Sequence, residues 1–495
     1  MTRSGEAETT LRADDAAEVA ELRAALERAG YTAAVLTELL GGGKPFARDL
    51  AEIPYHRRLL PPGTVLETVV ELLLFGVPVA EERVAAALRP LSPDRLERMG
   101  LVRRTAEGLE SLVDLVPFGE FFLASDRYEG ENPPSRRDHV AGVTPPARVL
   151  ADLVARRPAA SALDLGTGCG IQAVLLARHA ERVVATDLNA RAVAYADFNA
   201  KLNGLDAIEA RAGDLFEPVA GERFDLIVCN PPFVISPDEG SGYVFRDSPT
   251  RGDRFCEALV RAVPEYLEEG GLAHVVVSWT HGEGEDWSAP LRAWVAGSGC
   301  DALLVHLNSY TPLKHAAEWN RGLRWDADAY ADALDRWLAY YGAEGIEAVA
   351  WGAVILRKRR GADNWVWAES PPTDDMGAAG HHVLRVTASQ DLLAGLDGPG
   401  QLLDRVLVLA DDHRVDRFFH FEDGSGVIDR VQLRLDGGFA FELGVDLETV
   451  GVLAQLDGER TLRDVLVAGG IAPDDADSAT GGVRRLLELG FVVEA

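Results

Sequence analysis

The region that most constrains the fold lies between residues 145 and 280, where segments of helical and extended character alternate. Short apolar runs typical of strands are separated by stretches with the apolar periodicity of a helix. Such alternation favours a parallel sheet with helices on both faces. The expected helices are 145–156, 171–179, 190–203 and 251–269, and the expected strands are 161–165, 182–186, 208–211, 224–229 and 272–279.

Two later apolar runs are expected to complete this sheet. One covers residues 302–307, and the other, 346–357, is predicted to be an antiparallel edge strand. Between them, residues 325–342 carry aromatic side chains at helical spacing, which predicts an inserted amphipathic helix whose aromatic stripe belongs to the core. We therefore place one α/β domain at residues 129–370, with a polar linker or lid at 129–138.

The sequences on either side of this domain have a different pattern. Residues 1–128 contain several helical segments and then a predicted hairpin, in which 101–104 and 109–116 flank Ala106-Glu107-Gly108. This order resembles a winged helix. Residues 371–495 carry ten arginines and 23 acidic residues. Around Asp436-Gly437-Gly438 they show a hairpin pattern, and three helical segments follow it, which again resembles a winged-helix module.

Charge and composition exclude several function classes. The formal net charge of −30 disfavours non-specific binding to nucleic acid, so a nucleic-acid partner would need a local basic patch. The four cysteines have no C-x-x-C spacing, which favours a reducing compartment. No apolar run reaches the length of a membrane span, and the first residues lack the apolar core of a signal peptide. We expect a cytoplasmic protein without membrane contact.

The most specific local pattern is LDLGTGCGIQ, residues 163–172. An apolar strand leads into Asp164, and Gly166, Gly168 and Gly170 follow at alternate positions before a helix begins. Glycines at this spacing allow a tight turn and let a ligand approach backbone N–H groups at a helix N-terminus. The spacing differs from the dinucleotide fingerprint, in which the third glycine comes one residue later.

Two further acidic residues follow the next two strands. Asp187, followed by Leu188, ends the second strand and can accept hydrogen bonds from two ribose hydroxyls. Asp214, followed by Leu215, comes after the third strand, where it can accept from an adenine amino group. Because the carboxyl ends of neighbouring parallel strands meet at one crevice, this order predicts a binding site for an adenosine group.

The fourth strand ends in Asn-Pro-Pro-Phe, which comprises Asn230, Pro231, Pro232 and Phe233. The prolines fix the backbone, so that the Asn230 side-chain oxygen and the Pro231 carbonyl can act as two neighbouring acceptors. Two such acceptors suit an NH2 group on an sp2 carbon, which is found in a carboxamide and in the exocyclic amine of a nucleobase. Phe233 is predicted to stack on that planar group.

Residues 140–280 resemble the class I S-adenosylmethionine-dependent methyltransferases, specifically the small-methyltransferase and HemK-like group. The resemblance rests on LDLGTGCGIQAVLLA, VVATDLN, GDLFEPV and FDLIVCNPPF, in that order. It implies a Rossmann-like seven-stranded domain with a reversed edge strand and S-adenosyl-L-methionine as cofactor. It also implies that Gly166 and Gly168 border the methionine portion, Asp187 holds the ribose, Asp214 and Leu215 hold the adenine, and Asn230 binds the nitrogen to be methylated.

Three function classes fit this sequence. The preferred one is N-methylation of a glutamine or asparagine amide in a protein, such as a release factor or ribosomal protein. The second is methylation of an adenine or guanine amine in ribosomal or transfer RNA, and the third is a non-catalytic scaffold that keeps the cofactor fold. A small-molecule amine also remains open as a substrate. No His, Cys or Asp cluster has metal-ligand spacing, and we expect catalysis without a metal.

Overall fold

The computed structural model describes residues 11–41, 50–127, 136–238, 243–359, 361, 363–373, 376–422, 425–470 and 476–495. At its centre lies an eight-stranded mixed sheet with the strand order β12-β10-β11-β9-β8-β5-β6-β7. Strands β5 to β9 run parallel to one another. The strands of this sheet are β5 (Ala159–Leu165), β6 (Ala180–Asp187), β7 (Ile208–Ala212), β8 (Phe224–Cys229), β9 (Leu267–His281), β10 (Cys300–Tyr310), β11 (Ala348–Lys358) and β12 (Val366–Glu369).

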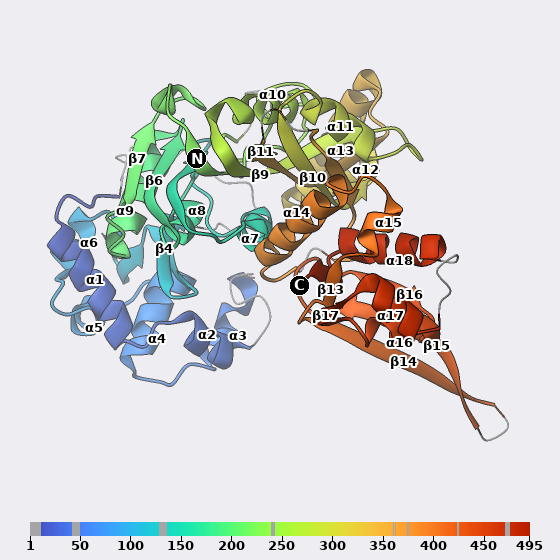
Figure 1. Cartoon of the computed structure of the whole chain (residues 1–495). Helices are drawn as coiled ribbons and strands as arrows, with labels where there is room; N and C mark the ends of the chain where they lie inside the picture. Colours follow the sequence, from blue (N-terminus) through green and yellow to red (C-terminus); the bar gives the residue numbers. More distant parts are fainter. Residues whose placement is uncertain are drawn as a thin grey trace.

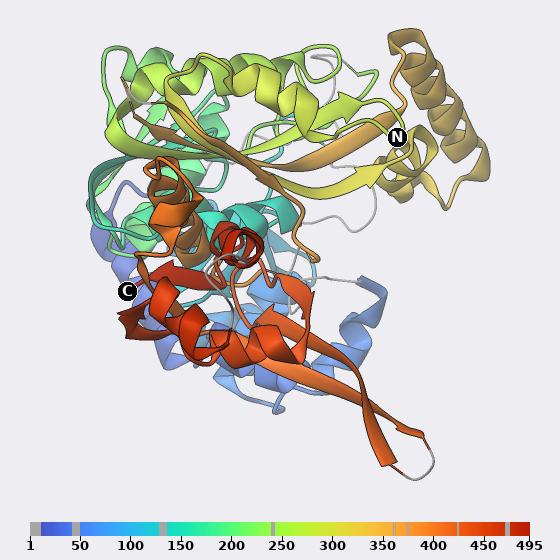
Figure 2. The same cartoon turned by 45° about the vertical axis from the view of Figure 1, so that its right-hand side comes forward.

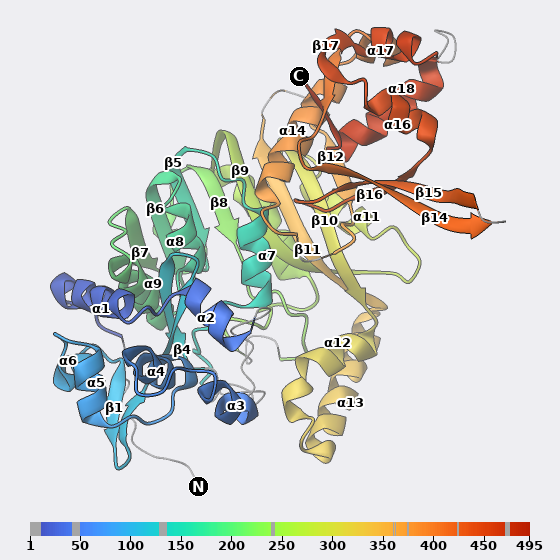
Figure 3. The same ribbon diagram turned by 90° about the horizontal axis from the view of Figure 1, so that it is seen from below.

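The predicted α/β class with a Rossmann-like sheet is confirmed, and each expected strand is present, but β12 makes eight strands where the resemblance implied seven. Helices lie on both faces of the sheet (Figure 1). The inserted helix is confirmed as α13, in which Trp337 and Tyr341 are buried as expected. Trp325 lies before the helix begins and is 77% exposed, so the predicted aromatic stripe belongs to the core only in part. With α12 it projects beyond the ends of β10 and β11 (Figure 3). The helices of this region are α7 (Pro145–Leu153), α8 (Ile171–Leu176), α9 (Ala190–Leu202), α10 (Arg254–Ala262), α11 (Ser288–Val295), α12 (Pro312–Trp319) and α13 (Ala327–Glu344).

Strand β11 differs from the prediction in its place in the sheet. It is antiparallel to both neighbours, as expected, but it lies between β9 and β10 and is therefore not an edge strand. The long apolar run of β11 explains this position, because a strand with a neighbour on each side and covered faces can be apolar at nearly every residue. The edge beyond β10 is closed instead by the short strand β12, which pairs with it in parallel.

The N-terminal region consists of short helices followed by two hairpins. The predicted hairpin around Ala106-Glu107-Gly108 is confirmed as β1 paired with β2. The second arm expected at 109–116 is instead divided between β2 and β3, which pair with different strands. The elements are α1 (Ala16–Arg28), α2 (Ala33–Leu40), α3 (Ile53–Arg57), α4 (Val65–Val69), η2 (Val70–Phe75), α5 (Glu81–Ala87), α6 (Pro93–Arg98), β1 (Val102–Thr105), β2 (Gly108–Ser111), β3 (Val113–Phe118) and β4 (Phe121–Asp126).

This region is joined to the central sheet layer by α9. The side-chain amide of Asn199 pairs with both backbone groups of Ala124, and that of Asn203 pairs with both backbone groups of Phe122. The two asparagine side chains thereby form the hydrogen bonds to backbone groups at the edge of β4 that a neighbouring strand would form. The apolar core of the N-terminal region continues into α8 and α9, where it includes Phe198.

The C-terminal region begins with α14, which packs against the face of β10 and β11, and ends in a small α/β unit (Figures 1 and 2). The predicted pairing around Asp436-Gly437-Gly438 is confirmed as β15 with β16, and all three predicted helices are present. The elements are α14 (Gly380–Ala394), α15 (Pro399–Leu402), β13 (Val406–Leu409), β14 (His413–Glu422), β15 (Ser425–Leu435), β16 (Glu442–Val445), α16 (Leu447–Leu453), β17 (Asp457–Thr461), α17 (Leu462–Ala468), α18 (Ala476–Glu488) and β18 (Val492–Glu494).

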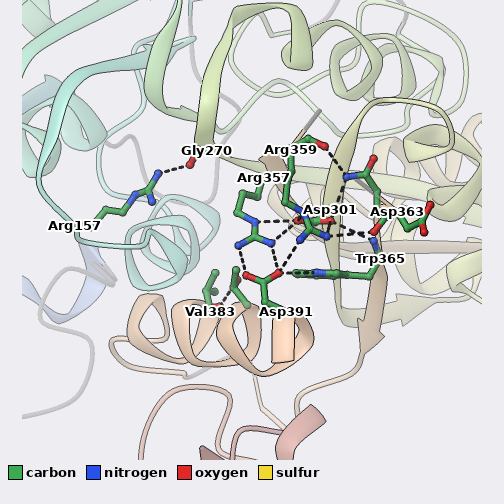
Figure 4. Close-up of polar contacts among 11 residues, drawn as sticks. Arg157, Gly270, Asp301, Arg357, Arg359, Asp363, Trp365, Val383 and Asp391 are labelled. Carbon is green, nitrogen blue, oxygen red and sulfur yellow. Dashed lines mark hydrogen bonds and ion pairs between the residues drawn. The ribbon is translucent and has the colours of Figure 1, made fainter. Parts of the chain in front are cut away.

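An ion cluster around the buried Asp301 attaches α14 to the sheet (Figure 4). Arg357 on β11 donates to Asp301 on β10 at 3.0 Å and to Asp391 on α14 at 2.6 Å. Arg359 donates to Asp301 at 3.0 Å, and the indole N–H of Trp365 donates to Asp391 at 3.2 Å. Because the Asp301 side chain is fully buried, its charge depends on these arginine partners.

Some predictions lie outside the described residues. Most of the predicted linker at 129–138, and with it the boundary between residues 128 and 129, belongs to the segment 128–135. Within the described parts of the chain, no helix is long and apolar enough to cross a membrane.

Candidate functional site

A cavity of about 550 Å3 opens at the carboxyl ends of β5, β6, β7 and β8. Ten of the twelve predicted site residues line it, and two do not. The ten residues are Asp164, Gly166, Gly168, Asp187, Leu188, Asp214, Leu215, Asn230, Pro231 and Pro232. The order of motifs along the chain thus predicted that the ends of these four strands meet at one cavity.

The loop after β5 forms one wall of the cavity. Gly166 and Gly168 have φ angles of +72° and +55°, and a Cβ atom at either position would meet no atom within 4 Å. Backbone conformation therefore requires glycine here, and the absence of side chains leaves open space beside the backbone. The loop is held in place because the N–H groups of Gly166 and Thr167 both donate to the Thr186 carbonyl, at 2.9 and 2.8 Å.

Asp164 lies beneath this loop and is almost fully buried. Its Oδ2 accepts hydrogen bonds from the Thr167 hydroxyl at 2.6 Å and from the Ala173 N–H at 2.9 Å. Burial raises the pKa of Asp164 to about 7, although these two hydrogen bonds oppose the increase. Asp164 therefore fixes the loop against the start of α8.

Asp187 ends β6 and orders the turn that follows it. Its Oδ2 accepts from the Gly168 N–H at 2.9 Å, and its Oδ1 accepts from the Asn189 N–H at 2.8 Å. Burial raises the pKa of Asp187 above its usual value. Since a carboxylate oxygen can accept two hydrogen bonds, each oxygen retains acceptor capacity toward the cavity, as two ribose hydroxyls would require.

The turn after β7 carries two unusual backbone conformations. Gly213 has a φ of +156°, and a Cβ atom there would lie 2.4 Å from Pro218 Cγ. Leu215 has a φ of +45°, which is uncommon for a residue with a branched side chain. Leu215 and Leu188 are both exposed at the cavity, so an apolar ring system would find two aliphatic side chains there.

Asn230 follows β8, the strand next to β5, and lines the cavity beside the glycine loop. Its Oδ1 is buried and accepts no hydrogen bond from any described residue. A buried acceptor without a partner carries a desolvation cost of about 1–3 kcal/mol. Such a cost is typical of a functional position, where a ligand N–H supplies the missing donor.

Gly170 and Phe233 do not reach the cavity. A Cβ atom on Gly170, whose φ is +82°, would lie 3.0 Å from Ala196 Cα, so this glycine permits close packing of α8 against α9. The Phe233 ring is buried in the core of the central sheet, which corrects the prediction that it stacks on the target group. The aromatic residues that line the cavity are Tyr243, Phe245 and Phe255.

The loop after the Asn-Pro-Pro-Phe motif carries Tyr243 and Phe245 of this aromatic wall, and Phe255 lies on α10. Two backbone hydrogen bonds, Val234 N–H to the Arg246 carbonyl and Ser248 N–H to the Val234 carbonyl, hold it against the motif. Arg246 donates twice to Asp247, each time at 3.0 Å, and Arg251 forms an ion pair with Glu344. Both arginines are thus paired with carboxylates of the same chain.

Sequence reasoning missed Asp126, which connects the N-terminal region to the cavity. Asp126 accepts hydrogen bonds from the Tyr195 hydroxyl at 2.6 Å, from the Val140 N–H at 2.8 Å and from Arg191. Val140 and His139 line the cavity, so this carboxylate on β4 positions one of its walls. No motif marks Asp126, because its three partners come from distant parts of the chain. Among the described residues, no His/Cys/Asp/Glu group is arranged to hold a metal ion.

Two family models match the sequence. The methyltransferase small domain matches residues 141–283, and a domain of unknown function (DUF7059) matches residues 28–112. The first match covers the strands that form the cavity, and the second covers most of the N-terminal helices and the first hairpin.

Three curated relatives illustrate the similarity. The release factor glutamine methyltransferase of Xylella fastidiosa is 38% identical over 24% of this chain and 47% of its own length. That of Agrobacterium fabrum is 30% identical over 39% of this chain and 68% of its own length. A ribosomal RNA small subunit methyltransferase C from Alcanivorax borkumensis is 34% identical over 23% of this chain and 31% of its own length.

The chain spans about half the length of the first relatives that it matches. A solved structure of the ribosomal protein L11 methylase from Lactobacillus delbrueckii is 17% identical, with a TM-score of 0.25, over 43% of this chain and 77% of its own.

Proposed function

The chain belongs to the family of small-domain methyltransferases, which use S-adenosylmethionine, and we propose that it methylates the nitrogen of a planar NH2 group. The observation that carries this proposal is the buried Asn230 Oδ1, which lies beside the glycine loop and accepts no hydrogen bond from any described residue. A primary amide or a nucleobase amine supplies the N–H group that this oxygen needs.

The residues of the cavity fit the cofactor. The space beside Gly166 and Gly168 accommodates its amino-acid portion, and Asp187 has acceptor capacity for the ribose hydroxyls. Leu188 and Leu215 offer aliphatic contacts to the adenine, whose amino group Asp214 binds. When bound, S-adenosylmethionine supplies an electrophilic methyl group on a positively charged sulfur.

Asn230 and Pro231 act on the target nitrogen. Conjugation with the neighbouring sp2 carbon makes the nitrogen lone pair a weak nucleophile. Two acceptors that each bind one N–H fix the orientation of the NH2 group and direct its lone pair toward the methyl carbon, so that positioning supplies much of the catalysis. No strong base is required, because the nitrogen loses its proton after the methyl group has been transferred.

The proposed substrate is a glutamine or asparagine side chain of a protein, such as a release factor or a ribosomal protein. Several relatives carry release factor glutamine methyltransferase in their names. The net charge of −30 and the pairing of Arg246 and Arg251 with carboxylates both favour a protein over RNA.

A second candidate is the exocyclic amine of an adenine or guanine in ribosomal or transfer RNA. One relative is named as a ribosomal RNA methyltransferase. Tyr243 and Phe245, with ring centroids 5.8 Å apart, offer an aromatic wall on which a nucleobase could stack.

We further propose that the chain is organised as an N-terminal domain (1–128), a catalytic domain (129–370) and an acidic C-terminal domain (371–495), and that it works in the cytoplasm. The two terminal domains would select the macromolecule that presents the NH2 group. The N-terminal domain has short helices followed by hairpins, and the C-terminal domain has a hairpin followed by helices. Both orders are compatible with winged-helix-like units.

The test is to incubate the purified protein with methyl-labelled S-adenosylmethionine and host lysate, and to run the Asn230→Ala variant in parallel. Label that is lost on protease treatment, and that depends on Asn230, would support amide methylation. Label that is lost on ribonuclease treatment would instead establish the RNA candidate. Equal labelling by the variant would contradict the role of Asn230 in both.

A further inference from the structure

The C-terminal region extends a long hairpin away from the rest of the molecule. Strands β14 and β15 pair in antiparallel fashion from His413↔Leu435 to Glu422↔Ser425. In all three views of the whole chain the far end of this hairpin projects beyond the other elements (Figures 1, 2 and 3). At its base, the hairpin packs into the C-terminal core through Leu433 and Leu435, both buried.

One edge of this hairpin has no neighbour. In the sheet β14-β15-β16, β14 lies at the edge, and no strand in the described parts of the chain pairs with its outer side. Nine of its ten residues are exposed. A long exposed edge strand presents unpaired N–H and C=O groups and can pair with another chain.

Two large apolar side chains near the far end strengthen the case for a partner. Phe419 and Phe421 are 58% and 83% exposed, although they follow Val415 on the face that is buried at the base of the hairpin. The apolar face thus continues beyond the core that covers it. Covering these rings with protein would remove their apolar surface from water.

The charges along β14 indicate what pairs with it. If a second copy of β14 pairs in antiparallel fashion about a twofold axis at Phe418, Arg414 lies opposite Glu422 of the other copy. Asp416 lies opposite His420, and Arg417 lies opposite Phe419, so that each pair joins groups that attract one another. The twofold axis forms each of these contacts twice.

Neighbouring registers lack this complementarity. Opposite residues in an antiparallel pair point to the same face of the sheet. A twofold axis perpendicular to the sheet must therefore lie where one residue is opposite the same residue of the other copy. Centring the pair on Arg417 places two arginines opposite each other, and centring it on Asp416 places two aspartates together. Centring it on Phe419 brings Asp416 opposite Glu422. The Phe418 register is therefore selected by electrostatics.

We propose that β14 is a self-association surface, through which two copies of this chain form a twofold dimer. Pairing of the two edges joins the sheets β14-β15-β16 of the two copies into one continuous six-stranded sheet. The inference does not depend on the proposed methyltransferase activity, because it rests on residues outside the cavity.

The test is sedimentation velocity of the full chain over a wide range of concentrations, in which we expect a concentration-dependent dimer. Arg414→Glu and Glu422→Arg should each weaken dimerisation by on the order of tenfold or more, because each replaces two attractive contacts with two repulsive ones. The double variant, with the two charges exchanged, should restore the dimer. Glu459→Arg, which makes the same charge change as Glu422→Arg at an exposed position of β17, should have no effect.

Restoration in the double variant separates pairing from misfolding, because two damaging substitutions in a hairpin would not otherwise cancel. A wild-type chain that stays monomeric at every concentration would overturn the proposal. So would a dimer that neither single variant weakens, since it would form through another surface. Failure of the double variant to recover would exclude the register centred on Phe418.

Discussion

Asn199 and Ala124 are joined by two hydrogen bonds that hold α9 against the last strand of the N-terminal region. The Asn199 Oδ1 accepts the Ala124 N–H at 2.8 Å, and its Nδ2 donates to the Ala124 carbonyl at 2.9 Å. The same Nδ2 donates at 2.7 Å to the carbonyl of Cys169, which belongs to the glycine loop. One fully buried amide therefore links the N-terminal region to the cavity.

We expect Asn199→Ala to lower the free energy of unfolding by about 2–4 kcal/mol, because it leaves buried backbone groups without partners. Denaturant titration measures this change. The control is Asp197→Asn on the same helix, where the exposed ion pair with Lys201 contributes less than about 0.5 kcal/mol. Equal stability of the Asn199 variant and the control would show that the amide does not hold this interface.

Asp187→Ala should weaken binding of S-adenosylmethionine by at least about tenfold, since it removes two proposed ribose contacts and the acceptor that orders the Gly168 N–H. Isothermal titration calorimetry measures the dissociation constant. Glu181→Gln, at an exposed position of the same strand, should bind as the wild type does. Unchanged affinity of the Asp187 variant would exclude the ribose role.

Asn230→Ala should lower kcat by about 100-fold or more while the dissociation constant of S-adenosylmethionine stays within about twofold. The reason is that Asn230 is proposed to contact the target nitrogen and not the cofactor. Single-turnover methyl transfer and a separate binding titration distinguish the two effects. A variant that loses cofactor affinity and turnover together would place Asn230 in cofactor binding instead.

Asp164 should make stability depend on pH. Its pKa of about 7 in the folded protein lies above the usual value of 3.8, so between these values the folded state keeps a proton that the unfolded state has lost. This contribution makes the free energy of unfolding fall as the pH rises from about 4 to about 7, and it is constant above that.

The comparison to make is the unfolding free energy at about pH 5.5 and at about pH 8 for the wild type and for Asp164→Asn. We expect the decrease toward high pH to be smaller in the variant, because the amide does not titrate. Asp197→Asn should keep the wild-type difference. An equal difference in all three proteins would mean that Asp164 is ionised throughout this range.

Local motifs were sufficient to predict most of the cavity. Asp164, Asp187 and Asn230 each follow a strand whose apolar run is unambiguous, and parallel strands bring their carboxyl ends to one edge of the sheet. Phe233 was misplaced because an aromatic residue beside a motif has the same sequence signature whether it faces a ligand or the core. The prediction that β11 lies at the edge of the sheet was also wrong, because the order of strands depends on packing that no local sequence pattern indicates.

The contacts that join the three regions could not be predicted. Asn199, Asp126 and Arg357 are ordinary polar residues in the sequence, and each becomes important only through partners far along the chain. The hairpin of β14 and β15 was missed for a related reason. Its outer strand β14 is almost entirely exposed, so the alternation of buried and exposed residues that reveals a strand is weak there.

The cores shared between the regions also have a consequence for unfolding. The N-terminal core includes residues of α8 and α9, and the C-terminal core includes residues of β10 and β11. Neither terminal region can separate without exposing apolar surface of the central sheet layer and of its own interior. The chain should therefore melt as one cooperative unit, and proteolytic trimming to the catalytic segment alone should yield an aggregation-prone fragment.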